Sequence, residues 1–240
     1  MMTLAPRIGF DRFIALEWAT TALKVRAGTA KLEDLELLLD DAGLGAAART
    51  KTRTVLKRLW LDPRVELVDF ADRGATIFKA APDLPLIAMH WGMAIATYPF
   101  FGKVSELIGR LSALQGDCAS AEIHRRMSEA YGEREGTYRM TNMVIQSQAA
   151  WGAVERAEKG KRVLRLAPAV VENDELTVWL IEAAVRNAGK PLALLGLQSL
   201  PVLFPFNLTR PLAYLVSNNE RLVVRSDGPN SQVVALRGSI

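Results

Sequence analysis

Between residues 104 and 166, the apolar positions of the chain predict three consecutive helices followed by two short strands. Within each helical segment, apolar side chains recur three and four positions apart, which is the repeat of a helix with one buried face. Gly116 and Gly132 are expected to end the first two helices, and Ser120 and Thr137 to cap the N-termini of the second and third. The expected helices are residues 104–116, 120–132 and 137–151, with buried positions Val104, Leu107, Ile108, Leu111 and Leu114, then Ile123, Met127 and Ala130, then Met140, Met143, Val144, Ser147 and Trp151.

The two strands predict a basic hairpin. Residues 153–157 and 163–166 are expected to pair around a turn in which Gly160 supplies the positive φ that such turns need. Lys159, Lys161 and Arg162 lie at this turn, where cations are well placed for phosphate groups.

The third helix carries a polar stripe opposite its buried one. Arg139, Asn142 and Gln146 share that stripe, and these residue types suit base edges, because arginine pairs with guanine and the amides pair with adenine. The sequence therefore predicts a surface that binds double-stranded DNA. The residues predicted to contact DNA are Arg125, Arg126, Arg134, Tyr138, Arg139, Asn142 and Gln146, then Lys159, Lys161 and Arg162, and, nearer the N-terminus, Arg49, Arg53 and Lys57.

The first 80 residues are expected to be all helical. The pattern predicts helices at residues 12–27, 31–42 and 46–61, with Asp11 as a cap of the first. Arg49, Arg53 and Lys57 share one face of the third helix, which contains no acidic residue, and like charges at this spacing repel. Two interpretations stay open: a solvated helix face, or contact with phosphate groups or an acidic partner.

Residues 62–102 combine a boundary with a very apolar segment. The letters VELVDF are compatible with a short strand or the start of a helix, and residues 72–85 are expected to be a boundary with turns. Residues 84–102 are apolar for about the length of a membrane span. His90 lies within this segment, and Pro85 and Pro99 lie near its ends, so we expect a buried helix over residues 86–98 and no membrane partner.

The C-terminal part partly repeats the central pattern. A helix over residues 174–187 is expected to end at Gly189, and an apolar helix is expected to follow, broken at Pro201 and Pro205. A short helix over residues 210–217 and a hairpin formed by RLVVRS and SQVVALR complete the chain. The order suggests a second unit of the central kind, but no residue-level repeat decides it. Because its corresponding helix carries few basic residues, a protein partner or a homodimer contact is an open alternative.

Composition and charge add little in favour of catalysis. The 30 basic and 26 acidic residues give a net charge of +4, which does not by itself indicate nucleic-acid binding. Cys118 is the only cysteine, so neither an internal disulfide nor a cysteine-based zinc site is expected, and a loop thiol is the default for it. His90 is expected to be a hydrogen-bonded core residue, and His124 to lie on the surface beside two arginines.

No phosphate-binding glycine loop, nucleophile elbow or dinucleotide motif is present, so we expect no enzyme activity, cofactor or metal. The opening MMTLAPRIGF lacks the apolar region of a signal peptide, which favours a cytoplasmic protein of bacterial type.

These patterns predict a mainly α fold with small β-hairpins. We expect an N-terminal helical domain (1–83), a buried linker helix with a helix–hairpin unit (84–171), and a helical and β-hairpin domain (172–240).

The segment from 104 to 171 resembles a winged helix-turn-helix unit, in which the second helix of the helix-turn-helix enters the major groove. TKTRTVLKRLWLDP and IAMHWGMAIATYPFF, in the first half, weakly resemble BrxA-like accessory proteins of BREX phage-defence islands. The two resemblances imply a non-catalytic DNA-binding regulator or defence accessory with protein partners in a complex. The alternative is an assembly module whose winged helices dock other proteins, with the apolar run LLGLQSLPVLFPF as its interface.

Overall fold

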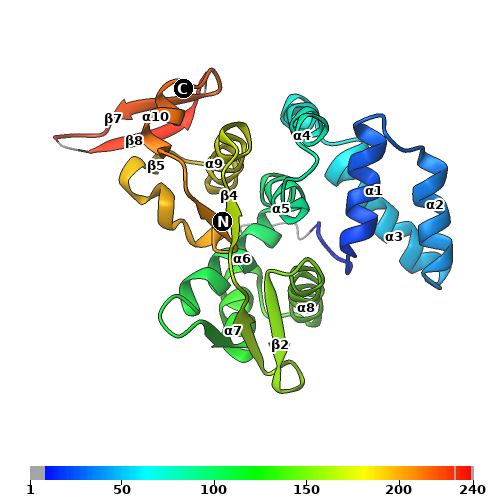
Figure 1. Cartoon of the computed structure of the whole chain (residues 1–240). Helices are drawn as coiled ribbons and strands as arrows, with labels where there is room; N and C mark the ends of the chain where they lie inside the picture. Colours follow the sequence, from blue (N-terminus) through cyan, green and yellow to red (C-terminus); the bar gives the residue numbers. More distant parts are fainter. Residues whose placement is uncertain (1–8, 230, 239–240) are drawn as a thin grey trace, which may run out of the picture.

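The N-terminal part of the chain is helical, as the sequence predicts. The computed structural model describes residues 9–229 and 231–238, so the chain start, on which the signal-peptide expectation depends, lies outside the described residues. The first elements are α1 (Leu16–Arg26), α2 (Leu32–Asp41), α3 (Ala46–Leu56) and the π-helical turn η1 (Lys57–Leu61) (Figure 1).

The expected Asp11 cap is wrong, because the segment before α1 is held by a distant helix. The Ile14 amide donates to the Ser147 hydroxyl oxygen over 2.9 Å, and the Trp151 indole donates to the Ile14 carbonyl over 2.9 Å. These bonds replace the ones a helix would supply to this backbone, so α1 begins only at Leu16.

A full helix occupies the region that was expected to be a boundary. The 3₁₀ turn η2 (Val65–Leu67) leads into α4 (Val68–Ala80). Gly74 lies within α4, and a β-carbon there would sit 2.8 Å from Cζ2 of Trp179. The glycine that weakens the local helix pattern therefore permits the contact with Trp179 that helps to hold the helix in place.

The apolar segment forms a buried helix, as predicted. Helix α5 (Leu86–Thr97) packs against α9 (Asp174–Ala188), and Gly92 of α5 lies directly against the Trp179 ring of α9. Among the described helices, none combines the length and apolarity needed to cross a bilayer.

The central segment contains the predicted three helices and hairpin, with one further short strand. Its elements are α6 (Pro99–Leu111), β1 (Asp117–Ala119), α7 (Ser120–Tyr131), α8 (Glu135–Ala150), β2 (Val154–Ala157), the turn η3 (Glu158–Gly160) and β3 (Arg162–Arg165). The antiparallel sheet has the order β1-β3-β2, so the strand before α7 pairs with the far strand of the hairpin.

Several details of this segment differ from expectation. Leu114 lies beyond the end of α6 and is 99% exposed, and Ala130 is exposed while Tyr131 is buried in its place. Ser120 is not the cap of α7, since its hydroxyl donates to the Gly160 carbonyl over 2.6 Å. Thr137 lies inside α8, where its hydroxyl donates to the carbonyl of Gly132.

In the C-terminal part, the hairpin and the long helix are confirmed, and the apolar helix is wrong. Asn173 caps α9 by accepting from the Leu176 amide, and Gly189 ends it in the left-handed conformation. A proline in the interior of an α-helix removes a hydrogen bond and clashes with the preceding turn, so the apolar run after Gly189 forms short 3₁₀ turns and strands instead. The other elements are β4 (Ala169–Val171), β5 (Leu192–Ala193), η4 (Leu194–Ser199), η5 (Pro201–Leu203), β6 (Phe206–Leu208), α10 (Leu212–Ser217), β7 (Leu222–Ser226) and β8 (Gln232–Leu236). Strand β4 pairs with β6 in parallel, and the antiparallel terminal sheet has the order β5-β8-β7.

The buried side chains form one cluster that runs from the N-terminal helices to the terminal hairpin. At its centre the Trp179 ring stacks on Phe70, with centroids 4.4 Å apart. One turn along α9, the fully buried carboxylate of Glu182 accepts from Arg73 and Arg186, each over 2.8 Å. This ion pair network lies beside the aromatic stack and joins α4 to α9.

Candidate nucleic-acid interface

Helix α8 presents the predicted polar stripe to solvent. Arg139 and Tyr138 are exposed, the latter by 56%, and Asn142 and Gln146 are partly exposed. The opposite stripe is buried, because Val144 and Ser147 pack toward the core. The structure therefore brings these four predicted side chains together along one accessible helix face.

The start of α8 carries charges of both signs. Arg134, at the N-cap position, donates to the Tyr131 carbonyl over 3.0 Å. Glu133 and Glu135 flank it and are exposed. Arg139 lies one turn further on and has no carboxylate partner among the described residues. The cationic character of this face therefore depends mainly on Arg139.

The hairpin turn exposes Lys159 and Lys161, as expected, and neither forms an ion pair within the described part of the chain. Gly160 has a φ of 85°, but Glu158 and Lys159 also adopt positive φ, which non-glycine residues rarely do. The two bonds of Ser120, from its amide to the Lys161 carbonyl and from its hydroxyl to the Gly160 carbonyl, hold this turn against the start of α7.

Three further predicted cations in this segment are neutralised within the protein. Arg162 donates to the Asp117 carboxylate over 2.7 Å, across the paired strands β1 and β3. Arg125 and Arg126 both pair with Glu122, and these hydrogen bonds lower the pKa of that carboxyl to about 2. A carboxylate of the protein therefore already compensates the charge of each of these arginines, which weakens its attraction for a phosphate.

The basic helix α3 belongs to the N-terminal helices, and the three cations predicted to contact DNA here also have partners. Arg49 and Arg53 pair with Glu36 of α2, and Lys57 pairs with Asp62 over 3.2 Å. The hydrogen bond from Arg53 lowers the pKa of Glu36. Neighbouring carboxylates thus supply the counter-charges that α3 itself lacks, which removes the reason to require a polyanionic partner there.

His124 is buried rather than on the surface, contrary to expectation. It is 8% exposed, and its ring stacks on Tyr138 with centroids 3.9 Å apart. Burial lowers its pKa, and a hydrogen bond with Asn142 acts in the opposite direction. His124 therefore contacts two side chains of the α8 stripe, Tyr138 and Asn142. The arginines beside it in the sequence did not indicate this role.

The remaining candidates for chemistry are structural. His90 is fully buried and hydrogen-bonds with Thr20 and Trp60, as predicted. Cys118 lies in β1 rather than in a loop, and burial raises its pKa to about 11, which keeps the thiol protonated. Within residues 9–229 and 231–238, no group of three or more His, Cys, Asp or Glu side chains is placed to hold a metal ion.

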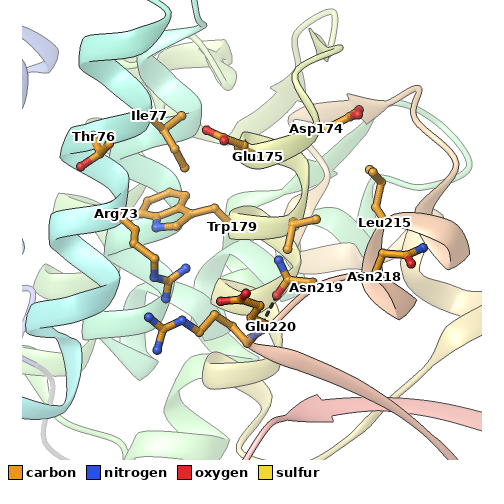
Figure 2. A pocket seen from close by; sticks show the side chains of 12 residues that line it. Arg73, Thr76, Ile77, Asp174, Glu175, Trp179, Leu215, Asn218, Asn219 and Glu220 are labelled. Atoms are coloured by element: carbon orange, nitrogen blue, oxygen red, sulfur yellow. Dashed lines mark hydrogen bonds between the residues drawn. The ribbon is translucent and has the colours of Figure 1, made fainter.

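A hollow of about 500 Å³ lies between α4, α9 and the segment after α10 (Figure 2). Its charged lining comprises Arg73, Arg221, Asp174, Glu175 and Glu220. Asp69 pairs with both arginines, and Arg73 also pairs with Glu182. The lining of this hollow also holds more carboxylates than cations, so it has no excess of positive charge, which disfavours it as a site for anions.

In comparisons with known proteins, no family model, curated protein or solved structure matches this chain.

Proposed function

We propose that this protein binds double-stranded DNA without catalysing a reaction, using α8 as the recognition helix and the β2–β3 hairpin as the wing. The observation that carries the proposal is the exposed stripe of Arg139, Asn142 and Gln146 on α8. The helix–strand–helix–helix–hairpin order and the β1-β3-β2 sheet support it, because a winged helix-turn-helix unit has this arrangement. On resemblance alone, we extend the proposal to a regulator or an accessory of a phage-defence system.

The two roles are expected to divide between helix and hairpin. Lys159 and Lys161 lie at an exposed turn without carboxylate partners, which suits contact with any phosphate backbone. The α8 stripe offers a guanidinium and two amides, which suit particular base edges. Affinity would come mainly from the hairpin, and sequence preference from the helix.

Replacing Lys159 and Lys161 together by alanine is expected to weaken binding to every duplex sequence alike. Because each lost phosphate contact releases about one counterion fewer, the slope of log K against log salt should become shallower by about 2. Duplex titrations at several salt concentrations measure this slope. A matched control replaces the exposed Lys24 and Lys79 of α1 and α4, which removes the same charge elsewhere. An equal loss of slope in the control would contradict a role for the hairpin.

Replacing Arg139 by lysine and Asn142 by alanine is expected to reduce base preference while largely preserving the salt dependence. The changes keep the charge at residue 139 but remove a bidentate guanidinium and an amide, each worth about 1–3 kcal/mol of discrimination. The measurement compares a duplex selected from a random pool with a scrambled duplex. If the variant binds DNA and still distinguishes the two duplexes as well as the wild type does, α8 is not the recognition helix.

The second candidate function is protein assembly. Leu195 is 94% exposed and Tyr214 of α10 is also exposed, which supports contact between the C-terminal part and a partner protein. Most of the apolar run that includes Leu195 is turned inward, with Leu197 and Leu203 in the core, so the interface would be smaller than the sequence suggests. Absence of salt-dependent duplex binding, with a partner bound through Leu195, would favour this function over the first.

A further inference from the structure

Two adjoining hollows share Lys190, the residue that follows the end of α9. The first, of about 440 Å³, lies between α6, the end of α9 and residues 190–202. The second, of about 290 Å³, lies between the end of α9 and strands β7 and β8. In Figure 1 the segment 194–203, which lines the first hollow, lies on the side of α6 away from α8 and its exposed stripe.

The charges around the two hollows are strongly unequal. Their basic lining residues are Lys103, Arg110, Arg186, Lys190 and Arg225, and the only acidic lining residue that the structure describes is Glu106. The hollow in Figure 2, by contrast, is lined by two arginines and three carboxylates. The hollows around Lys190 are therefore the better site for an anion.

The positive charge around the two hollows is only partly compensated. Glu106 pairs with Lys103 over 3.1 Å and with Arg110 over 2.6 Å, so one carboxylate serves two cations. Arg186 is compensated by the buried Glu182. Lys190 is exposed, and no described carboxylate pairs with it. An anion in the first hollow would thus face a net excess of positive charge.

The first hollow also has an apolar wall and an open hydrogen-bond acceptor. Leu192, Leu200 and Val202 also line it. The amide nitrogen of Asn187, which also lines the hollow, donates to the Ile95 carbonyl over 3.0 Å, and its oxygen accepts no hydrogen bond from the described residues. These features match the parts of a nucleotide: the apolar residues suit its base, the acceptor suits an amino group on the base, and the cations suit its phosphates. The volume is in the range of small-molecule sites.

We propose that this hollow binds a nucleoside phosphate, with the phosphates between Lys190, Arg110 and Lys103 and the base against the apolar wall beside Asn187. The inference does not depend on DNA binding by α8. The proposed ligand is a free nucleotide rather than the backbone of a nucleic acid, although both offer phosphate groups.

Isothermal titration of the full chain with ATP and, separately, with inorganic pyrophosphate tests this proposal. Saturable binding of ATP is expected. Pyrophosphate should bind more weakly, because it has no base to contact the apolar residues. Lys190→Glu should weaken ATP binding at least tenfold, whereas Lys24→Glu, the same change on the exposed face of α1, should leave it unchanged. Glu106→Gln should tighten ATP binding severalfold, since it frees Lys103 and Arg110, a gain that a damaged fold would not produce.

Three results would overturn the proposal. The first is no saturable ATP binding, and the second is pyrophosphate binding as tight as that of ATP. The third is a Lys190→Glu variant that loses affinity for a DNA duplex while its ATP binding is unchanged, which would assign the cations to a nucleic-acid backbone. The duplex titrations of the α8 and hairpin variants report on the DNA proposal separately, so either one can fail alone.

Discussion

Replacing Gly92 by alanine is expected to lower the free energy of unfolding by about 3 kcal/mol, at the upper end of what overpacking of a core costs. A β-carbon at this position would lie 2.1 Å from Cζ3 of Trp179. That ring cannot turn away, because it stacks on Phe70 and its indole donates to the Phe70 carbonyl over 2.9 Å. Helices α5 and α9 would have to separate, and with them the centre of the core. Urea denaturation monitored by tryptophan fluorescence measures the loss.

The control for this prediction is another helical glycine with free space around it. Gly136 lies in the first turn of α8, and a β-carbon there would meet nothing within 4 Å. Gly136→Ala should therefore stabilise the protein by about 0.4–1 kcal/mol, by restricting the unfolded chain. A Gly92→Ala protein as stable as the wild type would show that α5 and α9 are not in close contact.

Lowering the pH from 7 to 5 is expected to cost about 2 kcal/mol of stability through His90 alone. Burial lowers the pKa of His90 to about 3, compared with 6.5 in an unfolded chain. Between these values the unfolded state binds a proton that the folded state does not, so stability falls as the pH falls. The loss begins near pH 6.5 and continues to about pH 3, at about 1.4 kcal/mol per pH unit.

The hydrogen bonds of His90 explain why the folded state excludes this proton. The Thr20 hydroxyl donates to the Leu16 carbonyl, so its oxygen accepts from Nε2 of His90 over 2.9 Å. Nδ1 accepts from the Trp60 indole over 3.1 Å. A second proton, on Nδ1, would point at the indole N–H, and no acceptor is available there.

A glutamine at position 90 makes the control variant. Its amide offers one acceptor for Trp60 and one donor for Thr20, but it does not titrate. His90→Gln should therefore lose about 2 kcal/mol less than the wild type between pH 7 and pH 5 in denaturation experiments. The same pH dependence in both proteins would contradict a neutral, proton-excluding His90.

The local pattern predicted helices well wherever one face is buried along the whole element. Helices α5, α7 and α9 and both hairpins lie close to their expected residues, because their apolar positions and glycine turns are local features. Helix α6 (Pro99–Leu111) begins and ends earlier than the expected 104–116, because Pro99 starts the helix and the residues after Leu111 form turns. The pattern failed where distant contacts decide the structure. In α4, Gly74 predicts the end of a helix, but the structure shows that this glycine makes room for the Trp179 ring. The pattern failed also between α9 and α10, where prolines and tertiary packing favour 3₁₀ turns over a helix.

For the candidate sites, the sequence by itself determined which cations and amides share a helix face, since that follows from the helical repeat. It could not determine which cations are already paired, because Arg162 finds Asp117 across a sheet and Arg53 finds Glu36 on another helix. Nor could it show that Lys190 and Arg110 line the same hollow. Repeats along the chain encode which side of an element faces the core. The partner of a charged side chain depends instead on how separate elements pack, and only the tertiary structure decided this packing.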